Sequence, residues 1–120
     1  MKNFLLINLV LLILLSSCNL GQEEFVSPLP GLWYVENAHG PHADDIVGGY
    51  MEFEEDGRFT WTTTRSVVEG TYEDFEEYFE VQYDGYEVKK KFDYHVKKGK
   101  LIIVPEISGQ KFFLSKVTQE

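Results

Sequence analysis

The sequence predicts an all-β protein, built as a single small antiparallel up-and-down barrel of about eight strands. From Gly31 onward, runs of aromatic and β-branched residues recur roughly every eight to twelve residues. Asp56-Gly57 and Asp84-Gly85 are dipeptides typical of tight hairpins. No segment after Gly31 has a long helical periodicity. Consecutive strands joined by tight turns pair as antiparallel neighbours, and closing such a sheet removes its exposed edges.

The expected strands are assigned from these runs and the turn residues between them. In the third, Phe59, Trp61 and Thr63 share one face, and the sixth places Phe92 and Tyr94 together on one face because side chains alternate along a strand. The predicted strands cover residues 32–36, 50–54, 58–65, 67–73, 78–83, 86–96, 101–104 and 111–116.

One stretch fits two structures. Tyr72, Phe75 and Phe79 have helical spacing, with acidic residues between them, which fits an amphipathic helix. A strand from Tyr78 onward is favoured because Asp84-Gly85 needs two flanking strands to form a hairpin. A short helical turn at residues 74–77 remains open.

Residues 1–17 have the layout of an export signal. A short positive segment containing Lys2 precedes an apolar run at residues 4–15, followed by Ser16 and Ser17. The run is shorter than the roughly 20 apolar residues that a membrane-spanning helix needs. We therefore expect a removable secretory signal rather than a permanent anchor.

The end of this signal resembles the lipobox of bacterial lipoproteins. Leu15-Ser16-Ser17-Cys18 places an aliphatic residue and two small residues before a cysteine. The resemblance implies that Cys18 carries a diacylglycerol, that cleavage occurs before it, and that the acyl chains hold the protein to a bilayer. By analogy with the sorting rule of enterobacterial lipoproteins, Asn19 in place of an aspartate after the cysteine implies the outer membrane of the cell envelope. Residues 18–30 are expected to be a tether, because residues 21–24 are polar or flexible and Pro28 and Pro30 favour an extended chain, and residues 31–120 are expected to be the barrel domain.

Charge and cysteine content exclude several classes of protein. The net charge of −9 argues against nucleic-acid binding, which requires a basic surface. A single cysteine excludes disulfides within the chain and metal sites built on several thiolates. The stability of the domain must then come from packing, and 15% aromatic residues is a plausible source.

Three motifs together resemble the lipocalin-like domains of bacterial envelope lipoproteins, especially those of the Bacteroidetes. Gly31-Leu32-Trp33 is similar to the Gly-x-Trp of the first lipocalin strand, residues 53–59 to a Phe-x-x-Asp-Gly-x-Phe hairpin, and Gly70-Thr71-Tyr72 to a Gly-Thr-Tyr strand. The Thr-Asp-Tyr signature of lipocalins is absent, and so is an arginine on the last strand to cover the tryptophan. Lys111 or Lys116 could substitute for that arginine.

The barrel predicts two alternative functions. An eight-stranded barrel is just wide enough to be filled by side chains or to hold one small ligand. The first hypothesis is an internal site for a small apolar or amphiphilic molecule; the alternative is a protein-interaction or structural module that docks an envelope protein through its charged outer faces. The candidate ligand-binding residues are Trp33, Phe53, Phe59, Trp61, Phe92 and Tyr94.

Polar clusters give weaker signals. His39, His42, Asp44 and Asp45 have side chains that can bind a divalent metal, but Gly40 and Pro41 mark a loop, and a solvated loop without metal is favoured. His95 is expected on the surface. We expect no metal and no cofactor.

A basic stretch is the other charged feature of the chain. It comprises residues 89–91 with Lys97, Lys98 and Lys100, and is either a docking site for an anionic partner or a charged outer face. The acidic run 73–80 is its expected electrostatic counterpart. No nucleophile elbow, zinc-protease motif or phosphate-binding loop is present, so we expect no enzyme activity.

Overall fold

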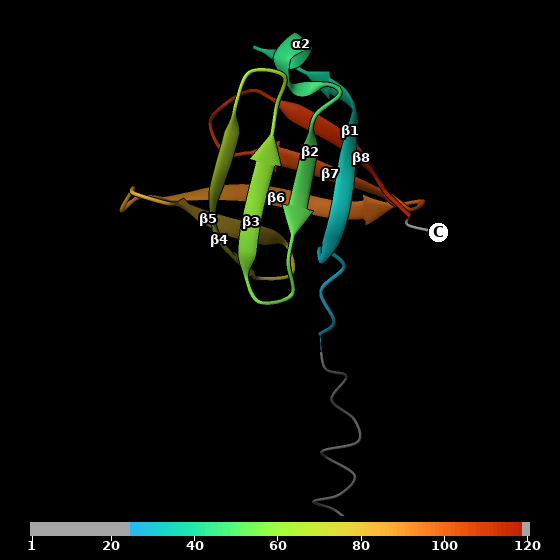
Figure 1. Cartoon of the computed structure of the whole chain (residues 1–120). Coiled ribbons are helices and arrows are strands. Elements are labelled where there is room, and N and C mark those ends of the chain that lie inside the picture. Colours follow the sequence, from blue (N-terminus) through green and yellow to red (C-terminus); the bar gives the residue numbers. More distant parts are fainter. Residues whose placement is uncertain (1–24, 119–120) are drawn as a thin grey trace, which may run out of the picture.

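The computed structural model describes residues 25–118, so the expected signal, the lipobox and Cys18 lie outside the described residues. The chain forms a closed antiparallel barrel in which each strand pairs with its neighbours in sequence and the last pairs with the first (Figure 1). The predicted fold class is confirmed. The strands are β1 (Gly31–His39), β2 (Tyr50–Phe53), β3 (Arg58–Thr62), β4 (Val67–Asp74), β5 (Tyr78–Tyr83), β6 (Lys89–Lys97), β7 (Lys100–Pro105) and β8 (Lys111–Lys116).

Pairing of β1 with β8 closes the barrel. Trp33 lies opposite Lys116 and Val35 opposite Leu114, while the register shifts between Val35 and Asn37. Such a bulge increases the local twist and bends the strand, which helps a short sheet to close on itself. Both edges of the sheet are thereby paired.

Gly70 allows a close approach between two strands. It lies opposite Tyr83 in the β4–β5 ladder. A Cβ atom at this position would lie 2.3 Å from the carbonyl oxygen of Gln82, which is far inside van der Waals contact. Steric exclusion of any larger side chain therefore explains why the Gly-Thr-Tyr motif begins with glycine.

Several strand ends differ from the sequence prediction. β1 extends to His39, whereas β3 ends at Thr62 because Thr63 accepts hydrogen bonds from the backbone of the following turn, including one from Ser66 N at 3.1 Å. Residues 86–88 are not part of β6, although they were expected to be. A turn follows β5, and the Gln82 side chain donates to the Tyr86 carbonyl at 3.0 Å, which holds this segment away from the ladder.

The ambiguous acidic segment is extended. β4 continues to Asp74, residues 75–77 form a turn, and β5 starts at Tyr78 as favoured from the sequence. The turn requires Glu76 to adopt a left-handed backbone conformation with φ of 76°. Its amide donates to the Asp74 carboxylate at 2.9 Å, and no helical turn forms here.

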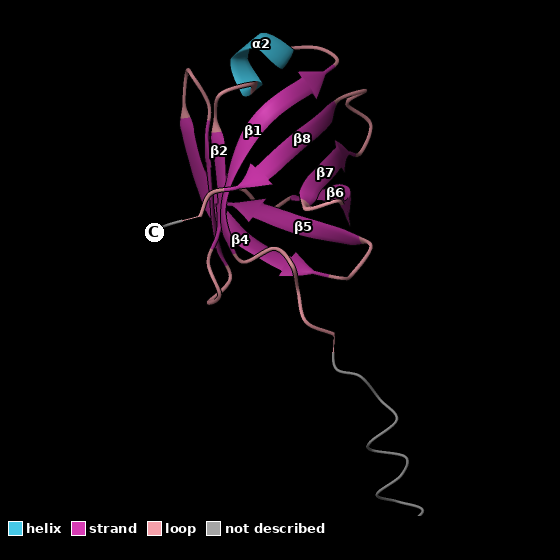
Figure 2. Cartoon of the chain, turned by 90° about the vertical axis from the view of Figure 1, so that its right-hand side faces the viewer, coloured by secondary structure: helices cyan, strands magenta, loops and turns pink. Residues whose placement is uncertain are grey.

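A short helix, α2 (Ala43–Ile46), covers one end of the barrel, and the sequence had not predicted it. Figure 2 shows α2 at the opposite end from the segment that leads into β1. We call the α2 end the distal end and the other the N-terminal end. Ile46 is buried and joins the core. Within residues 25–118, no helix has the length and apolar character needed to cross a membrane.

The barrel interior is built from alternating side chains of all eight strands. Phe53 and Phe59 face each other across β2 and β3, with ring centroids 5.1 Å apart. Phe79 on β5 lies 5.2 Å from Phe53 and stacks on Phe92 at 5.0 Å. Contacts of this kind add to the stabilisation from burial itself. Aromatic rings thus form a large part of the buried core, together with aliphatic side chains such as Leu101 and Ile103.

Phe79→Ala is expected to lower the free energy of unfolding by about 3–5 kcal/mol, because it leaves a cavity among the interior rings. Urea unfolding followed by tryptophan emission measures this loss. Phe75→Ala is the matched control on the adjacent turn, where the exposed ring contacts Tyr78, and should cost no more than about 1 kcal/mol. Equal losses in the two variants would contradict the packing described here.

Candidate functional site

The six side chains predicted to bind a ligand all belong to the inner face of the barrel. Five of them are buried, and Trp61 is partly exposed near the distal end. Four of the six meet at Phe79, which packs against Phe53, Phe59, Phe92 and Tyr94. Phe79 is not among the six predicted residues, because it lies in the acidic segment whose spacing also fits a helix. Its alternation with Val81 within the strand was the available signal.

Trp61 has one unusual feature. Its ring packs on Phe112, with centroids 5.7 Å apart. The indole Nε1 is buried and has no hydrogen-bond partner among the described residues. Buried donors are usually paired, so this nitrogen is the interior group whose hydrogen-bonding capacity is unused.

The Gly-x-Trp segment closes the N-terminal end of the barrel. Trp33 Nε1 donates to the Leu29 carbonyl at 2.8 Å, and Leu29 is itself fully buried. Lys116 lies over the Trp33 ring, with its Nζ 5.6 Å from the centroid, whereas Lys111 lies over Phe113. Lys116 therefore takes the position that the resemblance assigns to an arginine. Gly31, with φ of 136°, leaves room for it, since a Cβ there would lie 2.7 Å from Lys116 Cε.

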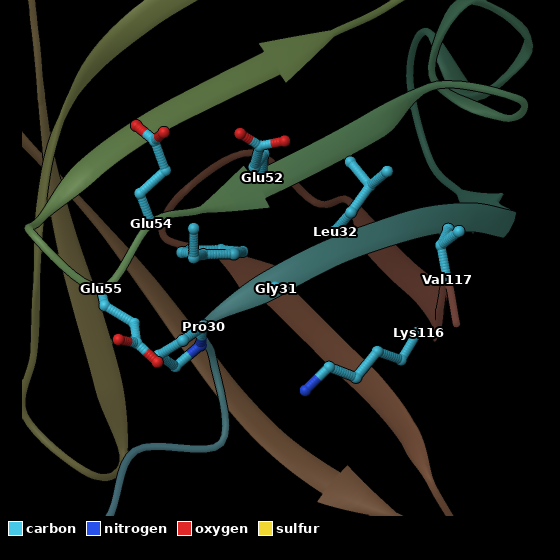
Figure 3. A pocket seen from close by; sticks show the side chains of 9 residues that line it. Pro30, Gly31, Leu32, Glu52, Glu54, Glu55, Lys116 and Val117 are labelled. Atoms are coloured by element: carbon cyan, nitrogen blue, oxygen red, sulfur yellow. The ribbon is translucent and has the colours of Figure 1, made fainter. Parts of the chain in front are cut away.

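A groove of about 490 Å³ opens beside the place where β1 pairs with β8 and closes the barrel (Figure 3). It is lined by Pro30, Leu32, three glutamates of the β2 region and the stem of Lys116. Figure 3 shows Glu52 and Glu54 projecting away from Lys116, and among the described residues Lys116 forms no ion pair. These carboxylates do not converge on a common point, so they do not form a binding site for a cation or another ligand in this groove.

Asp74 joins three segments at the N-terminal end. Its carboxylate accepts hydrogen bonds from the Ser27 hydroxyl, from the Tyr94 hydroxyl at 2.7 Å and from the Glu76 amide at 2.9 Å. Burial, followed by the hydrogen bond to the Asp74 carboxylate, raises the pKa of Tyr94 well above its usual range. This cluster fixes the incoming chain to the β4–β5 turn and to β6, which is a structural role.

The histidine loop lies at the distal end without forming a metal centre. Asp45 pairs with Arg65 at 3.2 Å, and the His39 ring packs edge-on against Phe113 at 5.5 Å. His42 is exposed, with a left-handed φ of 63°. Among residues 25–118, no group of three metal-ligating side chains lies close enough to hold an ion. His95 is exposed, as expected.

The basic stretch is divided between the two ends of the barrel. Residues 89–91 begin β6 at the distal end, whereas Lys97, Lys98 and Lys100 form the hairpin at the opposite end. Lys100 pairs with Glu36 at 2.6 Å. Lys91 lies opposite Glu80 in the β5–β6 ladder, so the acidic and basic runs do face each other across strands there.

Two grooves lie on either side of Tyr83, which lines both. One, of about 640 Å³, lies beside Val67, Val68 and Tyr86; the other, of about 490 Å³, separates residues 88–92 from the β7–β8 turn. Exposed apolar side chains border both grooves: Val67, Val68, Tyr86, Val88 and Ile107. The combination of lysines and exposed apolar side chains at this end makes it the candidate docking surface. The sequence indicated the lysines but not these neighbours, because the chain segments meet only after folding.

The fold and its surface define the protein as a small closed antiparallel β-barrel. No known protein family matches the chain, and no curated protein matches it either. A similar solved structure is the crystal structure of a DUF4847 family protein from Bacteroides vulgatus, with a TM-score of 0.53 and 16% identity. The similarity covers 77% of this chain and 96% of that one. At this level of identity the likeness supports the fold alone.

The half-buried Tyr83 gives a pH dependence that can be measured. Burial raises the pKa of Tyr83 to about 12, from about 10 in an unfolded chain. The folded state therefore holds its phenolic proton more tightly, and the associated stability is complete below about pH 10 and lost as the pH rises toward about 12. Tyr83→Phe is expected to reduce the fall in unfolding free energy over this interval, measured by urea unfolding at successive pH values. Tyr86→Phe, on an exposed ring, is the control, and identical pH dependences for the wild type and Tyr83→Phe would contradict this.

Proposed function

We propose that this protein is a lipid-anchored barrel of the cell envelope that docks an envelope protein through the outer surface of its distal end. The observation that carries the proposal is the interior packing. Phe53, Phe59, Phe79 and Phe92 contact one another across the barrel, and the space that would receive a ligand is occupied by their rings. A filled barrel acts through its outside.

The proposed anchor is Cys18, which lies outside the described residues and is supported by the lipobox-like segment before it. The chain from Cys18 to Phe25 can span at most about 25 Å. Leu29 and Ser27 are bound to the N-terminal end of the barrel. That end is then held near the bilayer and the distal end points toward possible partners. The sequence resemblance favours the outer membrane, and the Trp33–Lys116 contact agrees with a lipocalin-like seam.

Charge supports the distal end as the docking surface. Lys89 and Lys90 form no ion pair among the described residues, and Lys91 only approaches Asp93 at 3.9 Å. Three exposed ammonium groups follow one another here in a chain of net charge −9, and Glu80 is the acidic residue that lies opposite one of them, Lys91, across the β5–β6 ladder. Such a patch increases the rate of encounter with an acidic partner, while the apolar side chains around it provide area to bury.

An internal ligand remains the second candidate, and one observation favours it. The unpaired Trp61 Nε1 is a buried donor that an acceptor atom of a small molecule would satisfy. Trp61 and Phe112 lie near the distal end, where a ligand would have to enter past α2.

The lipid anchor predicts that Cys18→Ala abolishes acylation and releases the protein from membranes. Mass spectrometry of the mature N-terminus and sedimentation of membrane vesicles measure the two effects. Ser16→Ala keeps a small residue before the cysteine and is the matched control, expected to remain acylated. An intact Met1 on the wild-type protein, or a mature thiol without acyl mass, would sink the anchoring proposal.

The docking proposal predicts that changing residues 89–91 to glutamate reduces crosslinking to an envelope partner in cells by about tenfold or more. Lys97→Glu with Lys98→Glu, at the last residue of β6 and in the turn that follows it, is the control, and should leave crosslinking unchanged. Tryptophan emission tests the other candidate: saturable quenching by a hydrophobic probe, together with crosslinking indifferent to the 89–91 change, would favour the internal ligand instead.

A further inference from the structure

Strand β6 has a free edge where it begins. On one side it pairs with β5 from its first residue, Lys89 opposite Gln82. On the other side, pairing with β7 begins only at Phe92, opposite Pro105. Residues 89 and 90 therefore lie beside β5 and have no strand on their other side, whereas Lys91 is already bonded to Glu106, the residue after β7. A free edge in an otherwise closed barrel is a place where another strand can pair.

The direction of the unpaired backbone groups follows from one hydrogen bond. The Glu106 amide donates to the Lys91 carbonyl at 3.1 Å, so the backbone groups of Lys91 face the β7 side. In an antiparallel ladder alternate residues point their N–H and C=O the same way, which directs those of Lys89 to this side as well. Within residues 25–118 no backbone group bonds to Lys89 there.

The β7–β8 turn keeps this edge open. Pro105 ends β7 and has no N–H to offer a neighbouring strand. Ile107 follows with a left-handed φ of 69° and is 98% exposed, an unusual combination for a β-branched apolar residue. The turn is thereby directed away from residues 89–90, and the groove of about 490 Å³ lies between.

We propose that this groove binds an extended acidic segment of a partner protein by strand addition to β6, which rests on the docking function proposed above. Charge complementarity selects the occupant. Lys89 and Lys91 lie on one face of the strand and Lys90 on the other, while Glu106 is the one acidic residue that lines the groove. Main-chain hydrogen bonds to the N–H and C=O of Lys89, the residue of this edge whose backbone is not already bonded to Glu106, start the pairing, and the three ammonium groups select acidic side chains.

A second copy of this chain fits the edge poorly. Antiparallel pairing of two such edges would place lysines opposite lysines, which is destabilising. Lysines on a free edge oppose pairing between like chains and still permit pairing with an acidic strand. The groove is thus selective against self-association.

The test compares two changes at one residue, in the full-length protein in detergent. The probe is a short synthetic peptide of alternating Glu and Val, with binding followed by fluorescence anisotropy. Lys89→Ala removes the charge and keeps the N–H, whereas Lys89→Pro removes both at the first residue of a strand, where proline is tolerated. The proline variant is expected to bind about tenfold more weakly than the alanine variant, because backbone pairing is lost.

A second probe uses the wild-type protein alone and does not depend on any variant folding. The same peptide, N-methylated at alternate amides on its pairing edge, keeps its charge but cannot form the ladder, and should lose binding. Equal affinity of both peptides, or equal effects of Lys89→Ala and Lys89→Pro, overturns strand addition and leaves docking by charge intact. Strand addition is also overturned if the peptide does not bind at all. The same holds if a sulfated glycan displaces the labelled peptide as well as unlabelled peptide does. The crosslinking experiment above separately decides whether docking occurs.

Discussion

The pairing of the first strand with the last is the constraint on which the rest of this structure depends. It turns a meander of short strands into a closed barrel, and places Trp33 opposite Lys116 at the seam. Without it, β1 and β8 would each expose an unpaired edge, and the rings carried by β2, β3, β5 and β6 would lack a common interior. Closure and aromatic packing therefore support each other: the seam defines a small interior, and the rings of Phe53, Phe59 and Phe79 fill it.

The sequence predicted the strands well because their signals are local. Alternation with period two and the Asp-Gly turns depend on a few adjacent residues, and the eight runs they mark became the eight strands. The parts that were missed depend on distant contacts. α2 is too short to show periodicity, and Asp74 is joined to Ser27 across 47 positions, so neither leaves a local pattern. The basic stretch was treated as one feature because its members are adjacent in sequence. A strand rises about 3.3 Å per residue, so β6 carries its two ends to opposite ends of the barrel.

The candidate site illustrates why fold and function have to be argued separately. A protein of 16% identity adopts a similar barrel, so the architecture tolerates wide changes in its sequence. The function of this chain has to be inferred from chemistry at particular places: the packed rings of the interior, a free edge at residues 89–90 and the apolar side chains exposed around it. The ring positions could be predicted from alternation, but whether the rings leave space depends on their mutual packing. The resemblance to lipocalin-like domains addressed the architecture and could not address that point.

The attachment of the incoming chain has a mechanical consequence. Tension that reaches the barrel from the residue 25 side is first resisted by the Ser27–Asp74 and Leu29–Trp33 hydrogen bonds. It then acts along β1, which is flanked by β2 on one side and β8 on the other. The ladder bonds lie perpendicular to the strands, so such a pull loads them together in shear instead of opening them one after another. A domain whose first strand is paired on both sides resists a pulling force applied through its N-terminal segment better than one whose terminal strand can be peeled from an edge.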